Sequence, residues 1–211
     1  MTPGPLLGVL VSGRGSNLQA LIDASQDGTL GASIAVVISN IPDAFALERA
    51  RSAGIATSVI DHRGYSARDD FDRAIVDELR RRGVRLVCLA GFMRRLGRPL
   101  LDAFPDAVLN IHPSLLPSFP GLHPQRQAIA HGVKVSGVTV HLVTAELDAG
   151  PIVVQRPVPV HADDTEASLS ARILAEEHRA YPEAVRLVVS GRWCLDGRCW
   201  KSADSKGGSP T

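Results

Sequence analysis

Short apolar runs alternate with helical patterns over the first half of this 211-residue chain, and that alternation most constrains its fold. Strands are expected at residues 6–12, 34–39, 57–60, 85–90 and from 108 onward, with helices at 18–24, 43–53 and 66–82. Strands that alternate with helices predict an α/β fold, a mostly parallel twisted sheet with helices on both faces. A long helix from Thr165 to about Ser190 is expected to follow.

The chain is expected to end in a hairpin from Trp193 to Trp200 around an Asp-Gly turn. In that register Cys194 faces Cys199, and Trp193 faces Trp200. No repeat or linker is visible, so a single domain is expected over residues 1–201, and residues 202–211, small and polar, are expected to be a disordered tail.

Composition excludes several classes of function. The formal net charge is +1, which gives no electrostatic reason to expect binding to nucleic acid or to an anionic membrane. No run reaches the ~18 apolar residues of a membrane span, and the first residues do not resemble a signal peptide. Three cysteines make no disulfide framework, so a reducing, cytoplasmic location is the default expectation. No His or Cys spacing typical of a metal site is present.

A polar pair ends the strand that begins at Val108. Asn110 and His112 lie two residues apart, and side chains at i and i+2 of a strand point to the same face. A loop with four prolines follows, to Pro124. Core packing does not require an amide beside an imidazole, so we expect chemistry at this position.

The first strand is followed by the turn Gly13-Arg-Gly-Ser-Asn17 and then a helix, an arrangement that can bind an anion. The third glycine of a dinucleotide-binding motif is replaced by Leu18, and Ser39-Asn40 offers no acid for a ribose. If the turn binds a ligand, it suits one phosphate better than a dinucleotide. A plain tight turn with a serine cap is an equal alternative.

These features follow strands of a parallel sheet, so they are expected to gather along one edge. Asp148, in a loop before a later strand, would favour the imidazolium form of His112 if the loop folds over that edge. Imidazolium and the Asn110 amide are two donors for a developing oxyanion. Because no G-x-S-x-G nucleophile motif is present, a bound substrate, most simply an amine, is expected to supply the nucleophile.

Several motifs together resemble the folate-dependent formyltransferases that act on glycinamide ribonucleotide. The motifs are Ser12-Gly-Arg-Gly-Ser-Asn17, Leu89-Ala-Gly-Phe-Met-Arg94, Asn110-Ile-His-Pro-Ser-Leu-Leu-Pro117, Pro120-Gly-Leu-His123 and Glu146-Leu-Asp-Ala-Gly-Pro151. The resemblance runs from Leu6 to Gly191 and implies a Rossmann-like formyltransferase fold.

The resemblance also implies two sets of binding residues. The ribonucleotide phosphate and ribose would be bound by Gly15, Ser16, Asn17, Leu174, Ala175, Glu176 and Glu177. The folate would be bound by Arg68, Met93, Arg94, Arg95, Leu96, Asn110, Thr144, Ala145, Glu146, Leu147 and Asp148. Arg95 departs from the family, which usually has an aliphatic residue there.

In the implied reaction, the glycinamide amine attacks the formyl carbon of 10-formyltetrahydrofolate, a co-substrate. No tightly bound cofactor or metal is expected. Asn110, His112 and Asp148 would be the catalytic residues. Two alternatives stay open, a formyltetrahydrofolate hydrolase and a non-catalytic nucleotide-binding module. A tRNA formyltransferase would need a further domain and a basic surface. The sequence leaves open whether the protein is a monomer or a homodimer.

Overall fold

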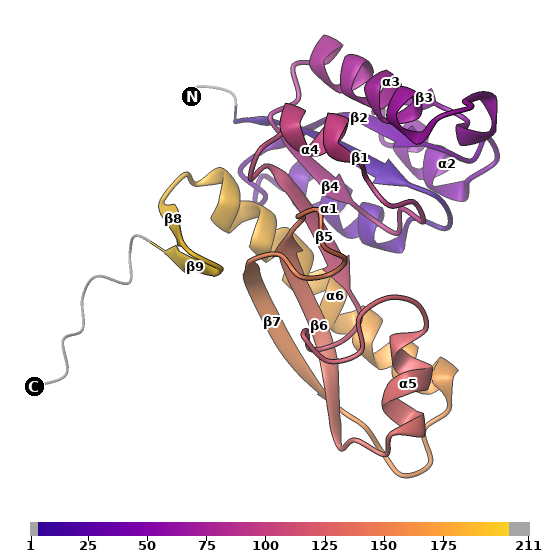
Figure 1. Cartoon of the computed structure of the whole chain (residues 1–211), viewed down its shortest axis with the longest axis vertical. Helices are drawn as coiled ribbons and strands as arrows, with labels where there is room; N and C mark the ends of the chain where they lie inside the picture. Colours follow the sequence, from indigo (N-terminus) through magenta and orange to yellow (C-terminus); the bar gives the residue numbers. More distant parts are fainter. Residues whose placement is uncertain (1–3, 203–211) are drawn as a thin grey trace, which may run out of the picture.

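The computed structural model describes residues 4–202, whose nine strands form one sheet in the order β3-β2-β1-β4-β5-β6-β7-β9-β8 (Figure 1). The strands are β1 (Leu6–Val11), β2 (Ser33–Ser39), β3 (Thr57–Val59), β4 (Leu86–Leu89), β5 (Val108–His112), β6 (Val135–Leu142), β7 (Ile152–Pro159), β8 (Trp193–Asp196) and β9 (Cys199–Ser202). The expected tail, apart from Ser202, lies outside the described residues.

The first five strands are parallel, which confirms the predicted mostly parallel α/β architecture. The sheet becomes antiparallel from β5 to β6 and from β6 to β7. Strand order reverses between β1 and β4, because the chain first builds outward to β3 and then returns to the other side of β1. The carboxyl ends of β1 and β4 therefore flank a topological switch point, where ligands bind in sheets of this kind.

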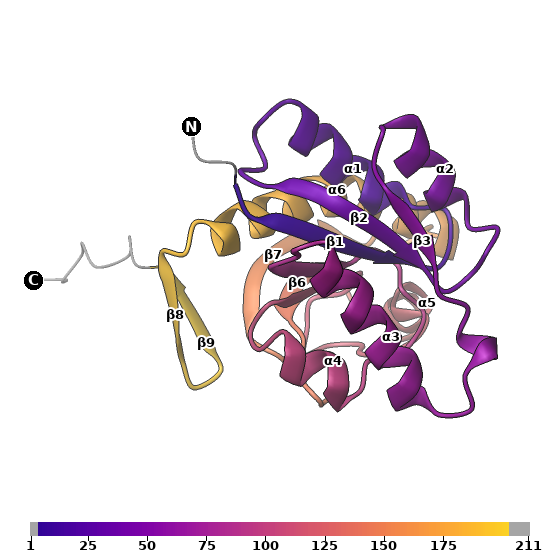
Figure 2. The same ribbon diagram turned by 90° about the horizontal axis from the view of Figure 1, so that it is seen from above.

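Helices cover both faces of the sheet, as Figure 2 shows. The helices are α1 (Ser16–Gln26), α2 (Phe45–Ser52), α3 (Arg68–Arg81), α4 (Arg98–Ala103), α5 (Pro124–Ala130) and α6 (Glu166–Val189), with a 3-10 turn η1 (His62–Gly64). Helices α1, α2 and α6 pack into the larger hydrophobic cluster on one face. Helices α3 and α4 pack into the second cluster on the other face.

Two short elements, η1 and α4, were not expected from the sequence. Helix α4 has only six residues and begins with a proline in its first turn, so it is too short to show a helical period. The long helix α6 starts beside its expected first residue, since Thr165 caps it through a reciprocal hydrogen-bonded pair with Ser168. Within residues 4–202, no helix combines the length and apolar character that a bilayer crossing requires.

The C-terminal hairpin forms, but its expected register was wrong. Asp196 pairs with Cys199, so the two turn residues are Gly197 and Arg198 rather than Asp196 and Gly197. Cys194 therefore lies opposite Lys201, and Trp193 opposite Ser202. Gly197 has φ 59°, and a glycine at the first central position is typical of type II′ hairpin turns. The Trp193 and Trp200 rings still stack, at 6.1 Å, as diagonal neighbours.

One buried tyrosine ties α6 to the two strands that lead into the switch point. The Tyr181 hydroxyl, fully buried, donates to the carbonyl oxygens of Leu89 at 2.9 Å and Leu109 at 3.2 Å. Leu89 is the last residue of β4, and Leu109 lies in β5 just before Asn110. The hydroxyl therefore fixes the helix against the strands that carry the polar residues.

We expect Tyr181→Phe to lower the free energy of unfolding by about 1 kcal/mol, because it removes a buried donor while keeping the ring. Urea denaturation of both proteins measures this difference. Tyr65→Phe is the matched control: Tyr65 is only partly buried, before α3, and its loss should change stability by less than about 0.5 kcal/mol. Equal effects of the two substitutions would contradict a stabilising role for the Tyr181 hydrogen bonds.

Candidate active site

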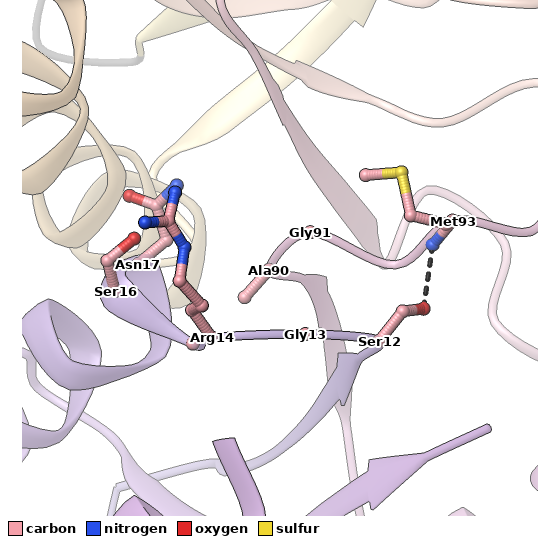
Figure 3. Close-up of a pocket in the computed structure, with 9 residues that line it drawn as sticks. Ser12, Gly13, Arg14, Ser16, Asn17, Ala90, Gly91 and Met93 are labelled. Carbon is pink, nitrogen blue, oxygen red and sulfur yellow. Dashed lines mark hydrogen bonds between the residues drawn. The ribbon is translucent and has the colours of Figure 1, made fainter. Parts of the chain in front are cut away.

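Four segments meet at the carboxyl ends of β1, β4 and β5. They are the turn after β1, the segment after β4, the end of β5, and the loop between β6 and β7. A cavity of about 270 Å³ opens between the first two, lined by Ser12, Gly13, Arg14, Gly15, Ser16, Asn17, Ala90, Gly91 and Met93 (Figure 3). The cavity therefore lies at the switch point, as the topology requires.

The turn after β1 is shaped to receive an anion. Gly15 caps α1 with φ 73°, and no side chain accepts a hydrogen bond from the first backbone N–H groups of that helix. A Cβ at position 15 would lie 2.6 Å from the Cβ of Ala46, so only glycine fits this conformation. The unoccupied N–H groups and the positive end of the helix dipole then face the cavity.

Sequence reasoning missed Arg14 as a lining residue. Among the residues that line the cavity Arg14 alone carries a charge, and Figure 3 draws its side chain on the same side of the turn as Ser16 and Asn17. Its carbonyl oxygen accepts a hydrogen bond from Arg49 Nε at 2.9 Å, which supports the turn from α2. The variable position of a glycine-rich turn gives no signal of this kind in the sequence.

Of the four residues of α6 expected to bind the ribonucleotide, one is hydrogen-bonded to this turn. Glu177 Oε2 accepts a hydrogen bond from Asn17 Nδ2 at 2.9 Å across 160 positions of sequence. Burial raises the pKa of Glu177, against the opposing effect of the Asn17 hydrogen bond. Leu174, one turn earlier, is partly buried, whereas Ala175 is exposed. Glu176 instead forms an ion pair with Arg179.

The pair expected at the end of β5 is present, and Asp148 reaches it. His112 Nδ1 lies 3.6 Å from Asp148 Oδ2, and both side chains are buried. The Gly121 N–H donates to the same Asp148 oxygen at 2.8 Å, which ties the proline loop to the loop between β6 and β7. His112 Nε2 lies 2.9 Å from the carbonyl oxygen of Phe119. Because a carbonyl only accepts, Nε2 carries a proton.

A second histidine completes this cluster. His141, in β6, pairs directly across the sheet with Asn110 and is buried. Its Nδ1 lies 2.9 Å from the Leu142 carbonyl oxygen, so Nδ1 carries the proton. Burial lowers the pKa of His141, so at neutral pH Nε2 is an acceptor. That Nε2 lies 3.2 Å from Asn110 Nδ2 and 3.8 Å from Asp148 Oδ1.

His141 therefore fixes the orientation of the Asn110 amide. One N–H of Asn110 Nδ2 donates to His141, and the second N–H stays available on the same nitrogen. His141 was not among the expected catalytic or binding residues. The alternating pattern of residues 135–143 and an antiparallel return of β6 would have been needed to pair it with Asn110.

Apart from Arg68 and Asn110, the expected folate residues lie on two segments beside this cluster. Met93, Arg94 and Arg95 are exposed after β4, and Leu96 is partly buried. The Arg95 side chain is exposed to solvent. Arg68 lies at the start of α3, with its Nε 3.5 Å from where a Cβ on Gly97 would be. The structure therefore places Arg68 next to the segment after β4.

The loop between β6 and β7 is the second of these segments. Thr144, Ala145, Glu146 and Leu147 are exposed, and Leu147 is one of the few large apolar side chains that solvent reaches. Asp148 ends the run with φ 50°, a conformation that aspartate tolerates better than most residues. This backbone turn points its carboxylate back toward His112.

Comparison with known proteins gives one consistent result. A model of the formyl transferase family matches residues 7–185. The chain is 46% identical to phosphoribosylglycinamide formyltransferase of Escherichia coli over 90% of this chain and 87% of that protein. It is 48% identical to the trifunctional purine biosynthetic protein adenosine-3 of Drosophila melanogaster, but spans only 14% of that protein's length.

Solved structures agree with these relatives. Glycinamide ribonucleotide transformylase 1 from Symbiobacterium toebii superposes with a TM-score of 0.94 at 52% identity, covering 96% of this chain and 95% of that one. A formyltetrahydrofolate deformylase from Pseudomonas syringae superposes with a TM-score of 0.88 at 26% identity. The similarity covers 95% of this chain and 66% of the deformylase.

The raised pKa of Glu177 predicts how its removal changes stability. The folded protein holds a proton on Glu177 more readily than the unfolded chain, so its stabilising contribution is full below the ordinary value of 4.5. That contribution is lost as the pH rises through the raised pKa. We therefore expect Glu177→Gln to be more stable than the wild type at neutral pH, and the difference to vanish near about pH 4.

Urea denaturation at the two pH values measures this. The matched control is Glu48→Gln, which removes an exposed carboxylate paired with Arg51 and should change stability by less than about 0.5 kcal/mol at either pH. A Glu177→Gln protein that is less stable than the wild type at neutral pH would contradict the cost of burying this charge.

Proposed function

The chain belongs to the formyl transferase family, and from this premise we propose that it transfers the formyl group of 10-formyltetrahydrofolate to the amine of glycinamide ribonucleotide. The relatives that match most of their own length carry this activity in their names. The reaction is a step of purine biosynthesis, which is also the role named for the longer animal relatives.

One observation carries the proposal: an anion-binding turn and an oxyanion-stabilising cluster open onto the same switch point. A nucleotide phosphate at the N-terminus of α1 would orient its sugar toward Glu177, since Asn17 and Glu177 are hydrogen-bonded. The rest of the ribonucleotide would then extend toward Asn110 and His112. A simple nucleotide-binding module has no need of the second cluster.

The ribonucleotide is bound by two elements in this proposal. The backbone of Gly15 and the side chains of Ser16 and Asn17 bind the phosphate, and Glu177 accepts hydrogen bonds from the ribose hydroxyls. Leu174, Ala175 and Glu176 are assigned to the same wall of α6 on the resemblance to the family.

The folate is bound on the opposite side of the cluster. The backbone of residues 93–96 and of residues 144–148 lines the pocket for the pterin ring, because both segments present polar backbone groups beside exposed apolar side chains. Asn110 lies between them. Arg68, exposed at the start of α3, pairs with a carboxylate of the folate tail.

The reaction is an acyl transfer between two bound substrates. The amine nitrogen attacks the formyl carbon, a C–N bond forms, and negative charge develops on the formyl oxygen. The free N–H of Asn110 and the Nδ1–H of protonated His112 stabilise that oxygen. The bond from the formyl carbon to N10 then breaks, and the proton lost by the amine reaches N10 through water held by Asp148.

The observed distances support these roles. His112 Nδ1 lies 3.6 Å from Asp148 Oδ2, beyond hydrogen-bond distance, so its N–H is not committed to that carboxylate and can donate to the oxyanion. Removing one oxyanion donor costs on the order of 10²–10³-fold in rate.

An assay with glycinamide ribonucleotide and 10-formyltetrahydrofolate tests the proposal. We expect formylated ribonucleotide and tetrahydrofolate in equal amounts. Folate turnover that proceeds equally well without the ribonucleotide would identify the protein as a formyltetrahydrofolate hydrolase instead, as in the Pseudomonas syringae neighbour. Binding of the ribonucleotide with no turnover in either assay would support a non-catalytic module. We also propose that the protein is cytoplasmic and is either a monomer or a homodimer.

We expect His112→Ala to reduce kcat by at least about 10²-fold, because it removes both an oxyanion donor and the partner of Asp148. Binding of the ribonucleotide, measured by calorimetry, should persist, since the phosphate turn is separate from His112. His161→Ala is the control, as His161 is exposed before α6. Near-normal turnover by His112→Ala would rule out the assigned role.

A further inference from the structure

We propose that the Ser12 hydroxyl is a positioning residue that fixes the backbone of residues 93–97 for folate binding. The inference rests on the proposed function, which gives these residues to the pterin pocket. Ser12 itself belongs to the other substrate's side of the site, since it immediately precedes the phosphate turn. One hydroxyl therefore joins the two substrate-binding segments.

Ser12 meets the segment after β4 by two hydrogen bonds. Its Oγ accepts from the Met93 N–H at 2.8 Å, the contact drawn as a dashed line in Figure 3. Its own backbone N–H donates to the Gly91 carbonyl oxygen at 3.1 Å. Met93 is thereby anchored through its backbone, while its side chain is 69% exposed. Because the Met93 backbone is held in place and its side chain is exposed, the main-chain groups of this segment are well placed to bind the folate.

The orientation of the Ser12 hydroxyl is set by the residues behind it. Ser12 Oγ donates its only proton to Asn40 Oδ1 at 2.6 Å, so a lone pair must face the Met93 N–H. Asn40 is buried at the end of β2, and its Nδ2 lies 3.2 Å from His62 Nδ1. The Ser12 hydroxyl, which follows β1, is thus oriented by Asn40, which follows β2. Asn40 is in turn contacted by His62, which follows β3.

An aromatic contact closes the same network. The Phe92 ring stacks on Phe71 with centroids 6.5 Å apart and planes 6° apart. Phe71 contacts the His62 ring edge-on at 6.3 Å. These contacts therefore form a closed ring. It runs from Ser12 through Asn40, His62, Phe71 and Phe92, and it returns to Ser12 through the adjoining Met93 amide. The start of the segment is held by polar and apolar contacts together.

The other end of the segment is anchored independently. The Gly97 N–H donates to Asp72 Oδ2 at 2.6 Å, and Asp72 is fully buried in α3. A Cβ at position 97 would lie 2.7 Å from that oxygen, so glycine is required for this contact. Only Arg94, Arg95 and Leu96 lie between the two anchors. With its far end fixed, the near end at Ser12 decides the path of this short stretch.

Such a stretch gains affinity from being ordered before the ligand arrives. A planar heterocycle that binds to backbone N–H and C=O groups needs them at fixed positions. Loss of the Ser12 hydroxyl leaves the Met93 N–H to solvent and loosens the near end, which then keeps only the Gly91 hydrogen bond and the Phe92 stack. The cost then falls on folate binding and not on the phosphate turn, whose backbone is held by Ala46 and Arg49.

The test compares Ser12→Ala with Ser12→Thr, which keeps a hydroxyl. We expect Ser12→Ala to raise the KM for 10-formyltetrahydrofolate by about three- to tenfold, with the KM for the ribonucleotide and kcat changed by less than about twofold. Ser12→Thr should restore most of the folate affinity. Hydrogen exchange of the Met93 amide in the free protein should speed up about tenfold in Ser12→Ala alone. Ser66→Ala, an exposed serine before α3, is the control.

Two results would overturn the inference: an unchanged folate KM with unchanged Met93 exchange in Ser12→Ala, or an equal rise in both KM values. Failure of the proposed function looks different. In that case the wild-type protein itself transfers no formyl group, and the exchange rate of the Met93 amide still decides whether Ser12 anchors the segment.

Discussion

The reversal of strand order between β1 and β4 is the constraint on which the site depends. Helices that follow neighbouring strands on either side of the reversal leave the sheet in opposite directions, since α1 packs in one hydrophobic cluster and α4 in the other. A gap at the carboxyl ends is the result. The turn after β1 and the segment after β4 are its two walls, and Ser12 bridges them.

The proposed catalytic groups come from the place where the sheet changes direction. Strand β5 ends the run of five parallel strands, and β6 runs back beside it. This return brings His141 opposite Asn110, and the loop that follows β6 folds back along β5 so that Asp148 reaches His112. Gly150 permits the close return of that loop, because a Cβ there would lie 1.7 Å from the Leu142 carbonyl oxygen. Rigid strands thus supply the donors, and a loop supplies the carboxylate.

Sequence periodicity predicted the direction of a side chain better than it predicted the residue that the side chain contacts. A two-residue spacing was enough to place Asn110 and His112 on one face at the end of β5, and the strand–turn–helix pattern located the turn between β1 and α1. The contact of Asp148 with His112 depends on a positive φ and on the Gly121 N–H, neither of which has a sequence period. The hairpin shows the same limit: Asp196-Gly197 and Gly197-Arg198 are both acceptable turns, and the choice moved every cross-strand pair.

The two histidines beside Asp148, His112 and His141, differ in the partners of their ring nitrogens. His141 is held neutral, because burial lowers its pKa and the Leu142 carbonyl fixes its proton on Nδ1. Its Nε2 then presents a lone pair to the Asn110 amide and offers Asp148 no positive charge. Of the two histidines, His112 lies nearer to the Asp148 carboxylate, at 3.6 Å against 3.8 Å. The neutral His141 orients the Asn110 amide, whereas His112 faces the Asp148 carboxylate with Nδ1 and the Phe119 carbonyl with Nε2, so two identical side chains make different contacts within one cluster.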